Sequence, residues 1–243
     1  METSIIIRTK NEERWLGECL RRLGEQTYRD FEIVIIDSGS TDRTLEIAQH
    51  FDTRILTIPE EDFTYPYASN FGCQNAYAEK YFVILSAHSL PIGKHWLADG
   101  LRHFSDPNVA GVYGGVFALP GSGFWEWLFF NPPLIRLFHM FKVKNIIQKI
   151  GMGVLGCTNA IIRRDLWEQH PFDERYGNGG EDTAWASYWI RKGRIFVRDF
   201  RFSVAHSHGL GLRGLIEQRK HWKSNATPQP FRRENFKYRE KGR

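Results

Sequence analysis

A carboxylate followed by small polar residues marks the first place in this sequence that could do chemistry. Asp37 ends an apolar run at 31–37 (FEIVIID), and Ser-Gly-Ser follows it. A carboxylate there can accept a hydrogen bond from the ring N–H of a uracil or thymine, while small residues let backbone N–H groups approach a sugar or phosphate. Asp37 could equally cap the helix that follows, so this string is ambiguous by itself.

A second candidate is the string Gly179-Gly180-Glu181-Asp182. Two glycines permit a close approach of backbone to ligand, and two acids at a helix start are stabilised as anions by the positive end of the helix dipole. An ionised carboxylate in a cleft can take a proton from an incoming hydroxyl. Helix capping is the structural alternative.

Three histidines form the third candidate. His88 follows the apolar run 81–86, and His206 and His208 alternate in the string VAHSHG. An imidazole can ligate a divalent metal, donate to a phosphate oxygen or satisfy a neighbouring carbonyl. Because side chains alternate along an extended chain, we expect only one of His206 and His208 to point the same way as His88. Zinc is not expected, since no compact set of four ligands is present.

The elements that must position these residues alternate between strand and helix in the first half of the chain. Apolar runs predict strands at 4–9, 31–37, 54–58, 81–86 and 109–117. Helical spacing predicts helices at 12–26, around 45–48, 68–80 and 96–104. The pattern indicates an α/β fold with a Rossmann-like, mostly parallel sheet covered by helices on both faces. Ligands bind beyond the carboxyl ends of such strands, so Thr9, 37–40 and 86–89 should face one crevice.

The second half is different in kind. Residues 124–150 combine large aromatic and aliphatic side chains with Lys and Arg, and Pro132 and Pro133 interrupt them. This segment is typical either of a buried helical pair or of an amphipathic element that lies on a membrane or grips a lipid. Further along, the pattern predicts helices at 164–169 and 180–192 and a strand at 193–199.

Composition excludes several classes of protein. The 243 residues are 42% hydrophobic and 25% charged, which rules out wholesale disorder, collagen-like and coiled-coil chains. Three cysteines without a CxxC pair predict no disulfide framework. We expect neither a signal peptide nor a membrane span, because no stretch of about 18 apolar residues occurs. The expected location is therefore the cytoplasm.

Positive charge is concentrated at the C-terminus. Residues 212–243 contain ten Lys or Arg and three Glu, while the whole chain carries a net charge of +5. Such a tail attracts an anionic surface, or it is a solvated segment without a partner. Nucleic acid is not an expected partner, because no base-reading motif accompanies the tail.

Taken in order, these strings resemble family 2 glycosyltransferases of the GT-A fold. The resemblance is carried by SIIIRTKNEERW through DSGSTDRT, ASNFG, YFVILSAHS, GCTNAIIRRDLWE, GGEDTAW and VAHSHG, and covers nearly the whole chain. The combination of WL, DPNVAGVYGG and the late HSH is similar to bacterial rhamnosyltransferase-like enzymes that build surface polysaccharides.

The resemblance implies a single GT-A domain over residues 1–243 that acts as an inverting hexosyltransferase. Residues 1–117 would bind a nucleoside-diphosphate sugar, residues 118–211 a saccharide or lipid-linked saccharide acceptor, and 212–243 would be a basic tail. The enzyme would then be cytoplasmic or peripheral on the inner face of the cell membrane, where the tail would meet anionic lipid.

For the site, the resemblance implies nucleotide-sugar contacts from Thr9, Asn11, Glu12, Asp37, Ser40, Asn70, Ser86 and His88. Asp182, together with Glu181, would supply the general base that deprotonates the acceptor. His88, His206 and His208 would act at the metal and diphosphate.

One departure concerns the metal. Family members carry D-x-D, or one Asp, at the end of the fourth strand, where this chain has Ser86-Ala87-His88. Oxygen ligands are preferred by hard dications, so two favourable charges are missing. Either His88 still binds a divalent metal such as Mn or Mg, or it replaces the metal by hydrogen bonding to the leaving diphosphate. The alternative function is a nucleotide-sugar or glycan binding protein of this fold without turnover.

Overall fold

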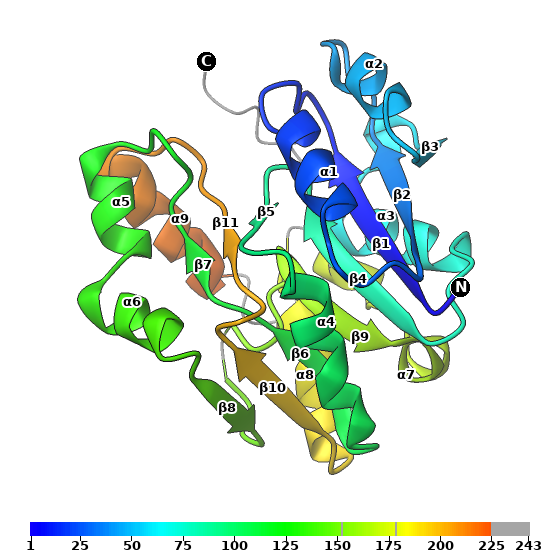
Figure 1. The fold of residues 1–243 in the computed structure, drawn as a ribbon, viewed down its shortest axis with the longest axis vertical. Helices are drawn as coiled ribbons and strands as arrows, with labels where there is room; N and C mark the ends of the chain where they lie inside the picture. Colours follow the sequence, from blue (N-terminus) through cyan, green and yellow to red (C-terminus); the bar gives the residue numbers. More distant parts are fainter. Residues whose placement is uncertain (152, 178, 225–243) are drawn as a thin grey trace.

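The computed structural model describes residues 1–151, 153–177 and 179–224 (Figure 1). Its main sheet is built from β1 (Thr3–Thr9), β2 (Phe31–Asp37), β3 (Arg54–Thr57), β4 (Tyr81–Ser86), β6 (Val109–Tyr113), β8 (Lys144–Ile147), β9 (Asn159–Arg163) and β10 (Ile195–Asp199). A small second sheet is built from β5 (Leu90–Pro91), β7 (Val116–Phe117) and β11 (Val204–Ala205).

The order of the large sheet is β3-β2-β1-β4-β9-β6-β10-β8. The first four strands run parallel, β9 runs antiparallel to both β4 and β6, and β10 runs parallel to β6. At the far edge, β8 runs antiparallel to β10. The sheet is therefore mostly parallel, as the alternation of elements predicts.

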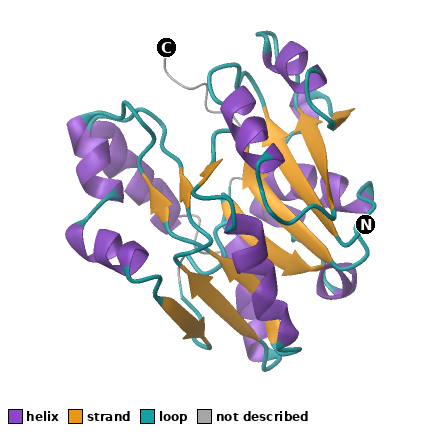
Figure 2. Ribbon diagram, in the orientation of Figure 1, coloured by secondary structure: helices purple, strands orange, loops and turns teal. Residues whose placement is uncertain are grey.

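Helices cover both faces of this sheet (Figure 2). The helices are α1 (Leu16–Gly24), α2 (Thr44–Gln49), α3 (Tyr65–Gln74), α4 (Trp96–Leu101), α5 (Phe124–Phe130), α6 (Pro133–Met140), α7 (Arg164–Gln169), α8 (Glu181–Arg191) and α9 (Leu212–Ser224), with 3-10 turns η1 (Glu60–Asp62), η2 (Arg102–Ser105) and η3 (Glu174–Tyr176). Ile5 and Ile7 join a core with α1 and α4, and Ile6 joins the core with α3, α7 and α8. This alternation follows from the period of two along a strand.

Strand register brings the predicted ligand-facing positions to one edge. Thr9 lies opposite Asp37 in the β1–β2 pair, and Arg8 lies opposite Ser86 in the β1–β4 pair. The Ser38 N–H donates to the Thr9 carbonyl at 3.1 Å. The carboxyl ends of β1, β2 and β4 therefore meet, as expected.

Element boundaries differ from prediction where caps and glycines intervene. Helix α3 begins three residues before the predicted helix 68–80 and ends six residues earlier. Thr64 caps it by accepting from the Tyr67 N–H at 3.1 Å, and Pro66 occupies the first turn, where proline is favoured. The predicted strand 109–117 is interrupted at Gly114, where a Cβ would collide with the carbonyl of Phe202.

The segment 124–150 is not a buried helical pair, so that interpretation is wrong. Helices α5 and α6 stand beside the small sheet and α9, apart from the main sheet (Figure 1). Phe124 is 67% exposed and Met140 is 64% exposed, because no layer of the described structure covers this side. Within the described ranges, no helix is both long and apolar enough to cross a bilayer.

The basic tail falls only partly within the structure. Helix α9 contains its beginning, and residues 225–243 lie outside the described residues. The attraction of the tail to an anionic surface stays a prediction, as does the division of the chain at residues 117 and 211.

Candidate active site

Two loops at the carboxyl ends of β1 and β2 are tied together by hydrogen bonds. The Asn11 N–H donates to Ser40 Oγ at 2.9 Å, and Asn11 Oδ1 accepts from the Thr41 N–H at 2.8 Å. The Glu12 N–H donates to Thr44 Oγ1 at 2.7 Å. Asn11 has φ +52°, a left-handed conformation that its short side chain tolerates better than most. These hydrogen bonds therefore hold the two loops together as one unit.

Asp37 holds the turn that follows β2. Its Oδ2 accepts from the N–H groups of Gly39 and Ser40 at 3.0 Å each, and its Oδ1 accepts from Ser40 Oγ. Asp37 is buried and organises the turn at 38–40, but it does not cap the following helix α2, which begins at Thr44. Each carboxylate oxygen has two acceptor sites, so Oδ1 keeps one for a ligand.

Thr9 offers a more direct sign of a ligand. Its hydroxyl is buried at the end of β1, and no group in the described ranges hydrogen-bonds Oγ1. Leaving a buried hydroxyl unsatisfied costs about 1–3 kcal/mol. Since buried polar atoms are nearly always satisfied, Thr9 Oγ1 is suited to meet a bound molecule.

The three histidines lie together. Ring centroids are 4.4 Å apart for His88 and His206, 5.2 Å for His88 and His208, and 4.7 Å for His206 and His208. One ligating atom from each lies within 4.8 Å of the others. The expectation that only one of His206 and His208 joins His88 is wrong, because residues two apart along an extended chain point to the same face.

Glu12 lies behind His88, and the sequence did not predict this contact. Glu12 Oε1 is 2.9 Å from His88 Nδ1, and both side chains are buried. A carboxylate on Nδ1 fixes the ring orientation and makes Nε2 the nitrogen that faces a ligand. Glu12 therefore acts on the site through His88.

A second carboxylate, Glu126, holds the loop that carries the other two imidazoles. Glu126 is fully buried at the start of α5. Its Oε1 accepts from the His208 N–H at 2.8 Å, and its two oxygens also accept from the N–H groups of Gly209 and Leu210. The His206 N–H donates to the Phe117 carbonyl at 2.7 Å. The one sign of Glu126 in the sequence is that it is a lone acid in an apolar run.

The histidine cluster fits some divalent metals better than others. Imidazole nitrogens suit first-row transition metals, whereas Mg²⁺ prefers oxygen ligands in near-ideal octahedral geometry. His88, His206 and His208 offer nitrogen atoms only. Of the two metals predicted, the donor set therefore fits Mn better than Mg.

Glu181 and Asp182 open helix α8. Gly179 and Gly180 precede them with φ of +108° and +99°, which explains why glycines occupy these positions. Asp182 is half-buried, and its carboxylate accepts from the N–H groups of Cys157 at 3.1 Å and Thr183 at 2.6 Å.

Burial and, to a smaller extent, the neighbouring Asp182 raise the pKa of Glu181 from 4.5 to about 8, against the opposing charge of Arg8. Glu181 Oε1 is 3.7 Å from Arg8 Nη1, but this guanidinium gives its hydrogen bonds to the carbonyls of Cys157 and Tyr65. The ion pair is therefore too loose to offset burial. Burial also raises the pKa of Asp182, and the N–H groups of Cys157 and Thr183 lower it.

These opposing effects separate the two carboxyl groups. Burial raises the pKa of Glu181 to about 8, while Asp182 accepts two backbone N–H groups that lower its pKa, so we assign the proton to Glu181 and the charge to Asp182. Pairs of acids in unlike environments commonly divide acid and base roles in this way. Arg8 was missed by sequence reasoning, although a lone arginine in the apolar run SIIIRT was a usable signal.

A chain of contacts joins Asp182 to the end of β4. The Ser86 N–H donates to the Thr158 carbonyl at 3.3 Å, and the adjacent Cys157 N–H donates to Asp182. His88 follows Ser86 by two residues. The carboxylate and the histidine cluster are thus both attached to the carboxyl end of this strand.

Asn70 does not join the group. Its Nδ2 donates to the Phe172 carbonyl and to Glu174, and its Oδ1 accepts from Trp167 Nε1 and the Phe172 N–H. These four bonds use the full hydrogen-bonding capacity of a buried amide. Asn70 ties α3 to the segment after α7, and its predicted contact with ribose and phosphate has no support in this geometry.

Comparisons with known proteins agree on one family. Residues 4–170 match the model of glycosyl transferase family 2. The chain is 29% identical over 204 residues to the O-antigen chain rhamnosyltransferase WbaN of Salmonella anatum, covering 80% of this chain and 62% of that protein. It is 32% identical over 245 residues to a dolichyl N-acetyl-alpha-D-glucosaminyl phosphate 3-beta-D-2,3-diacetamido-2,3-dideoxy-beta-D-glucuronosyltransferase of Methanococcus voltae, covering 86% of this chain and 74% of that protein.

Solved structures share the fold. A mannosyltransferase from Pyrobaculum calidifontis, in complex with GDP-Man and Mn²⁺, superposes with a TM-score of 0.64 at 20% identity, covering 90% of this chain and 60% of that chain. Staphylococcus aureus TarS 1-349 in complex with UDP gives 0.65 at 18% identity, covering 93% and 65%. The fold is the GT-A glycosyltransferase fold. The chain spans about three fifths of the length of the Salmonella relative.

Proposed function

Since this chain belongs to glycosyl transferase family 2, we propose that it moves a sugar from a nucleoside-diphosphate sugar to an acceptor hydroxyl with inversion at the anomeric carbon. The observation that carries the proposal is the position of Asp182. A half-buried, hydrogen-bonded carboxylate lies at the carboxyl end of the strand that leads to the histidine cluster. A base and a site for a leaving diphosphate are thus held on one edge of the sheet.

The reaction proceeds as a single displacement. Asp182 accepts the proton of the acceptor hydroxyl as its oxygen attacks the anomeric carbon. The new carbon–oxygen bond forms while the bond to the phosphate oxygen breaks, and the diphosphate leaves with the electron pair. One displacement without a covalent intermediate inverts the configuration.

The tied loops at 9–12 and 38–44 bind the nucleotide. Thr9 Oγ1 supplies a buried donor, Asn11 and Ser40 line the sugar and phosphates, and the remaining acceptor site of Asp37 Oδ1 takes the ring N–H of the base. Ser86 lies where the diphosphate meets β4.

Charge on the leaving diphosphate is offset by the imidazoles of His88, His206 and His208. These three residues would hold a divalent metal such as Mn, with Glu12 orienting His88. Bound there, the metal would supply Lewis-acid stabilisation of the phosphate oxygens. The mannosyltransferase neighbour is a complex with Mn²⁺, which supports this assignment.

A saccharide, carried on a lipid, is the proposed acceptor. One relative is named for an O-antigen chain and the other for a dolichyl N-acetyl-alpha-D-glucosaminyl phosphate, and these names favour a lipid-linked saccharide as acceptor. These names favour a hexose as the donor sugar and surface polysaccharide synthesis as the setting.

Asp182→Asn tests the assignment of the base. The assay follows release of nucleoside diphosphate from a panel of donor sugars, with and without chelator. The kcat of Asp182→Asn should be about 10²–10⁴-fold lower than that of the wild type, while the Kd for the donor changes little. Asp165→Asn, an exposed aspartate on α7, is the matched control and should leave kcat unchanged. Wild-type turnover by Asp182→Asn would refute the base. Donor binding by the wild type without any release would instead support the binding protein without turnover.

A further inference from the structure

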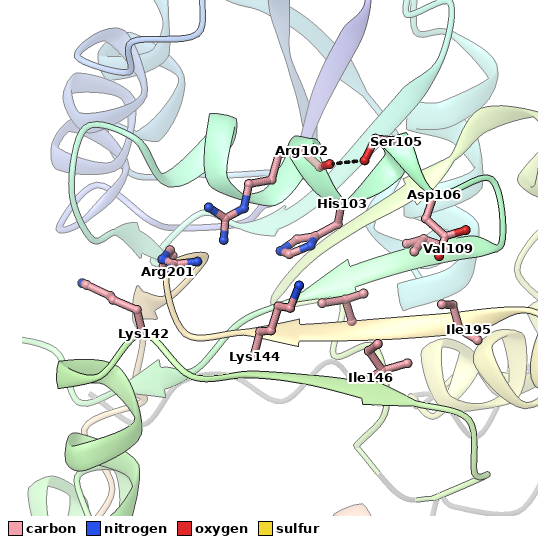
Figure 3. Close-up of a pocket in the computed structure, with 11 residues that line it drawn as sticks. Arg102, His103, Ser105, Asp106, Val109, Lys142, Lys144, Ile146, Ile195 and Arg201 are labelled. Atoms are coloured by element: carbon pink, nitrogen blue, oxygen red, sulfur yellow. Dashed lines mark hydrogen bonds between the residues drawn. The ribbon is translucent and has the colours of Figure 1, made fainter.

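One cavity of the structure lies away from the candidate active site. It has a volume of about 630 Å³ and opens beside η2, β8 and β10 (Figure 3). Its wall is formed by Arg102, His103, Ser105, Asp106, Val109, Lys142, Lys144, Ile146, Ile195, Val197 and Arg201. None of these residues belongs to the site assigned to donor and acceptor, so this cavity needs its own explanation.

Positive charge dominates the cavity. Arg102 and His103 are held by the fully buried Asp199, at 2.8 and 2.7 Å, and Arg201 lies 3.9 Å from the same carboxylate. Arg102 also pairs with Asp99 at 3.1 Å, so two acids hold these three basic residues. Figure 3 shows Lys144 reaching from its strand toward His103, so the cations of two segments converge on one space.

The two lysines add charge without a neutralising partner. Throughout the ranges that the structure describes, no carboxylate forms an ion pair with Lys142 or Lys144. Lys142 has φ +52° at the position just after α6, where its N–H donates to the His139 carbonyl. Glycine is usual at such a helix end, and the Cβ of a lysine makes this conformation unfavourable. The fold thus fixes a cation at this edge of the cavity despite the strain.

An apolar surface adjoins the same edge. Phe141 is 67% exposed and Ile146 58%, next to the two lysines in the chain, and Met140 precedes them. Across residues 124–150 the one acid, Glu126, is buried under the loop at 208–210, so the exposed part of this segment carries no acidic side chain. Aromatic residues and lysines together are typical of surfaces that enter the interface of an anionic bilayer.

We propose that the cavity binds the phosphate of an anionic lipid while the exposed apolar side chains of 124–150 enter the bilayer interface. Cations from η2, β8 and the loop after β10 surround the phosphate, and Phe141 and Met140 contact the acyl region. Charge complementarity selects the occupant, because a neutral partner would leave the lysines unpaired against the apolar surface. This attachment site is separate from the transfer chemistry and does not depend on it.

Vesicle sedimentation of the full chain tests the proposal. Wild type should bind phosphatidylglycerol vesicles and bind phosphatidylcholine vesicles weakly. The double variant Lys142→Gln/Lys144→Gln should bind the anionic vesicles about 30-fold more weakly, since each basic residue near the surface contributes about 1 kcal/mol. The control Arg191→Gln/Lys192→Gln removes the same charge from the exposed end of α8 and should leave binding unchanged.

Two further measurements separate the sources of phosphate and of affinity. Titration with inorganic phosphate, followed by NMR of the His103 ring, should shift the wild type and leave the Lys142→Gln/Lys144→Gln variant unshifted. Phe141→Ser should weaken binding to vesicles and leave the phosphate titration unchanged. Donor turnover in detergent should be the same in every variant, which separates this proposal from the transferase assignment.

Some outcomes would overturn the proposal. Wild type that binds neither vesicle type, or binds both equally, shows that no anionic lipid is recognised. A vesicle affinity that the double variant and the control reduce equally shows that charge outside the cavity, including the basic tail, accounts for binding. A phosphate response without vesicle binding shows a site for free phosphate only.

Discussion

Replacing Glu181 by Gln removes a buried carboxyl group while keeping its size. Burial raises the pKa of this group from 4.5 to about 8 in the folded protein. Between these values the folded state holds a proton that the unfolded state has lost, so stability falls as pH rises. The contribution of Glu181 is complete below about pH 4.5 and is lost as pH passes through about 8.

The size of the effect follows from that interval. A shift from 4.5 to about 8 corresponds to at most about 5 kcal/mol, at 1.36 kcal/mol per pKa unit. Asp182 shares the burial and the repulsion, and Arg8 lies 3.7 Å away, so part of this free energy belongs to the group as a whole. We expect the wild type to lose about 2–3 kcal/mol more than Glu181→Gln between pH 5 and pH 8.5.

Urea denaturation at half-unit steps from pH 5 to pH 9 measures this difference. The free energies of unfolding of wild type and Glu181→Gln should be close at pH 5, and the variant should be the more stable at pH 8.5. Glu61→Gln, which changes an exposed glutamate, is the matched control and should follow the wild type. Parallel profiles for wild type and Glu181→Gln would show that Glu181 is ionised in the folded protein, and the assignment of the proton to Glu181 would be lost.

Three other substitutions test the contacts around the site. Glu12→Gln replaces the carboxylate behind His88 by an amide and should reduce the affinity for Mn²⁺ about 10- to 100-fold, measured by calorimetry with nucleoside diphosphate present. Unchanged affinity would place the metal elsewhere. Glu126→Ala leaves three backbone N–H groups without their acceptor and should lower the free energy of unfolding, measured in urea, by about 2–4 kcal/mol. A loss under about 0.5 kcal/mol would contradict the anchoring role of Glu126. Gly114→Ala forces a Cβ against a backbone carbonyl and should lower the free energy of unfolding by about 3 kcal/mol. The control Gly24→Ala, where space is open, should change it little. Equal urea midpoints for the two variants would refute the close approach at Gly114.

The local parts of the molecule were predictable from the sequence. Apolar runs gave β1, β2 and β4 almost to the residue, because a strand buried on both faces requires consecutive apolar side chains. The position of Asp37 at the end of such a run, and the rule that parallel strands end at one edge, were enough to predict that Thr9, Asp37 and Ser86 come to the same edge of the sheet. Helix α3 was displaced in the prediction because its start depends on the cap at Thr64 and not on periodicity.

Contacts between side chains far apart in the chain could not be predicted in this way. Glu12 and His88 are 76 residues apart, and Glu126 reaches His208 across 82. The exposure of α5 and α6 was equally hidden, since the same apolar pattern fits a buried helix and one that faces a membrane. The sequence alone determined the family, the sheet and the edge at which the candidate site residues meet, because these follow from neighbours along the chain. Only the tertiary structure decided which carboxylate meets which imidazole or guanidinium and which apolar face stays open, because those contacts depend on how distant segments pack.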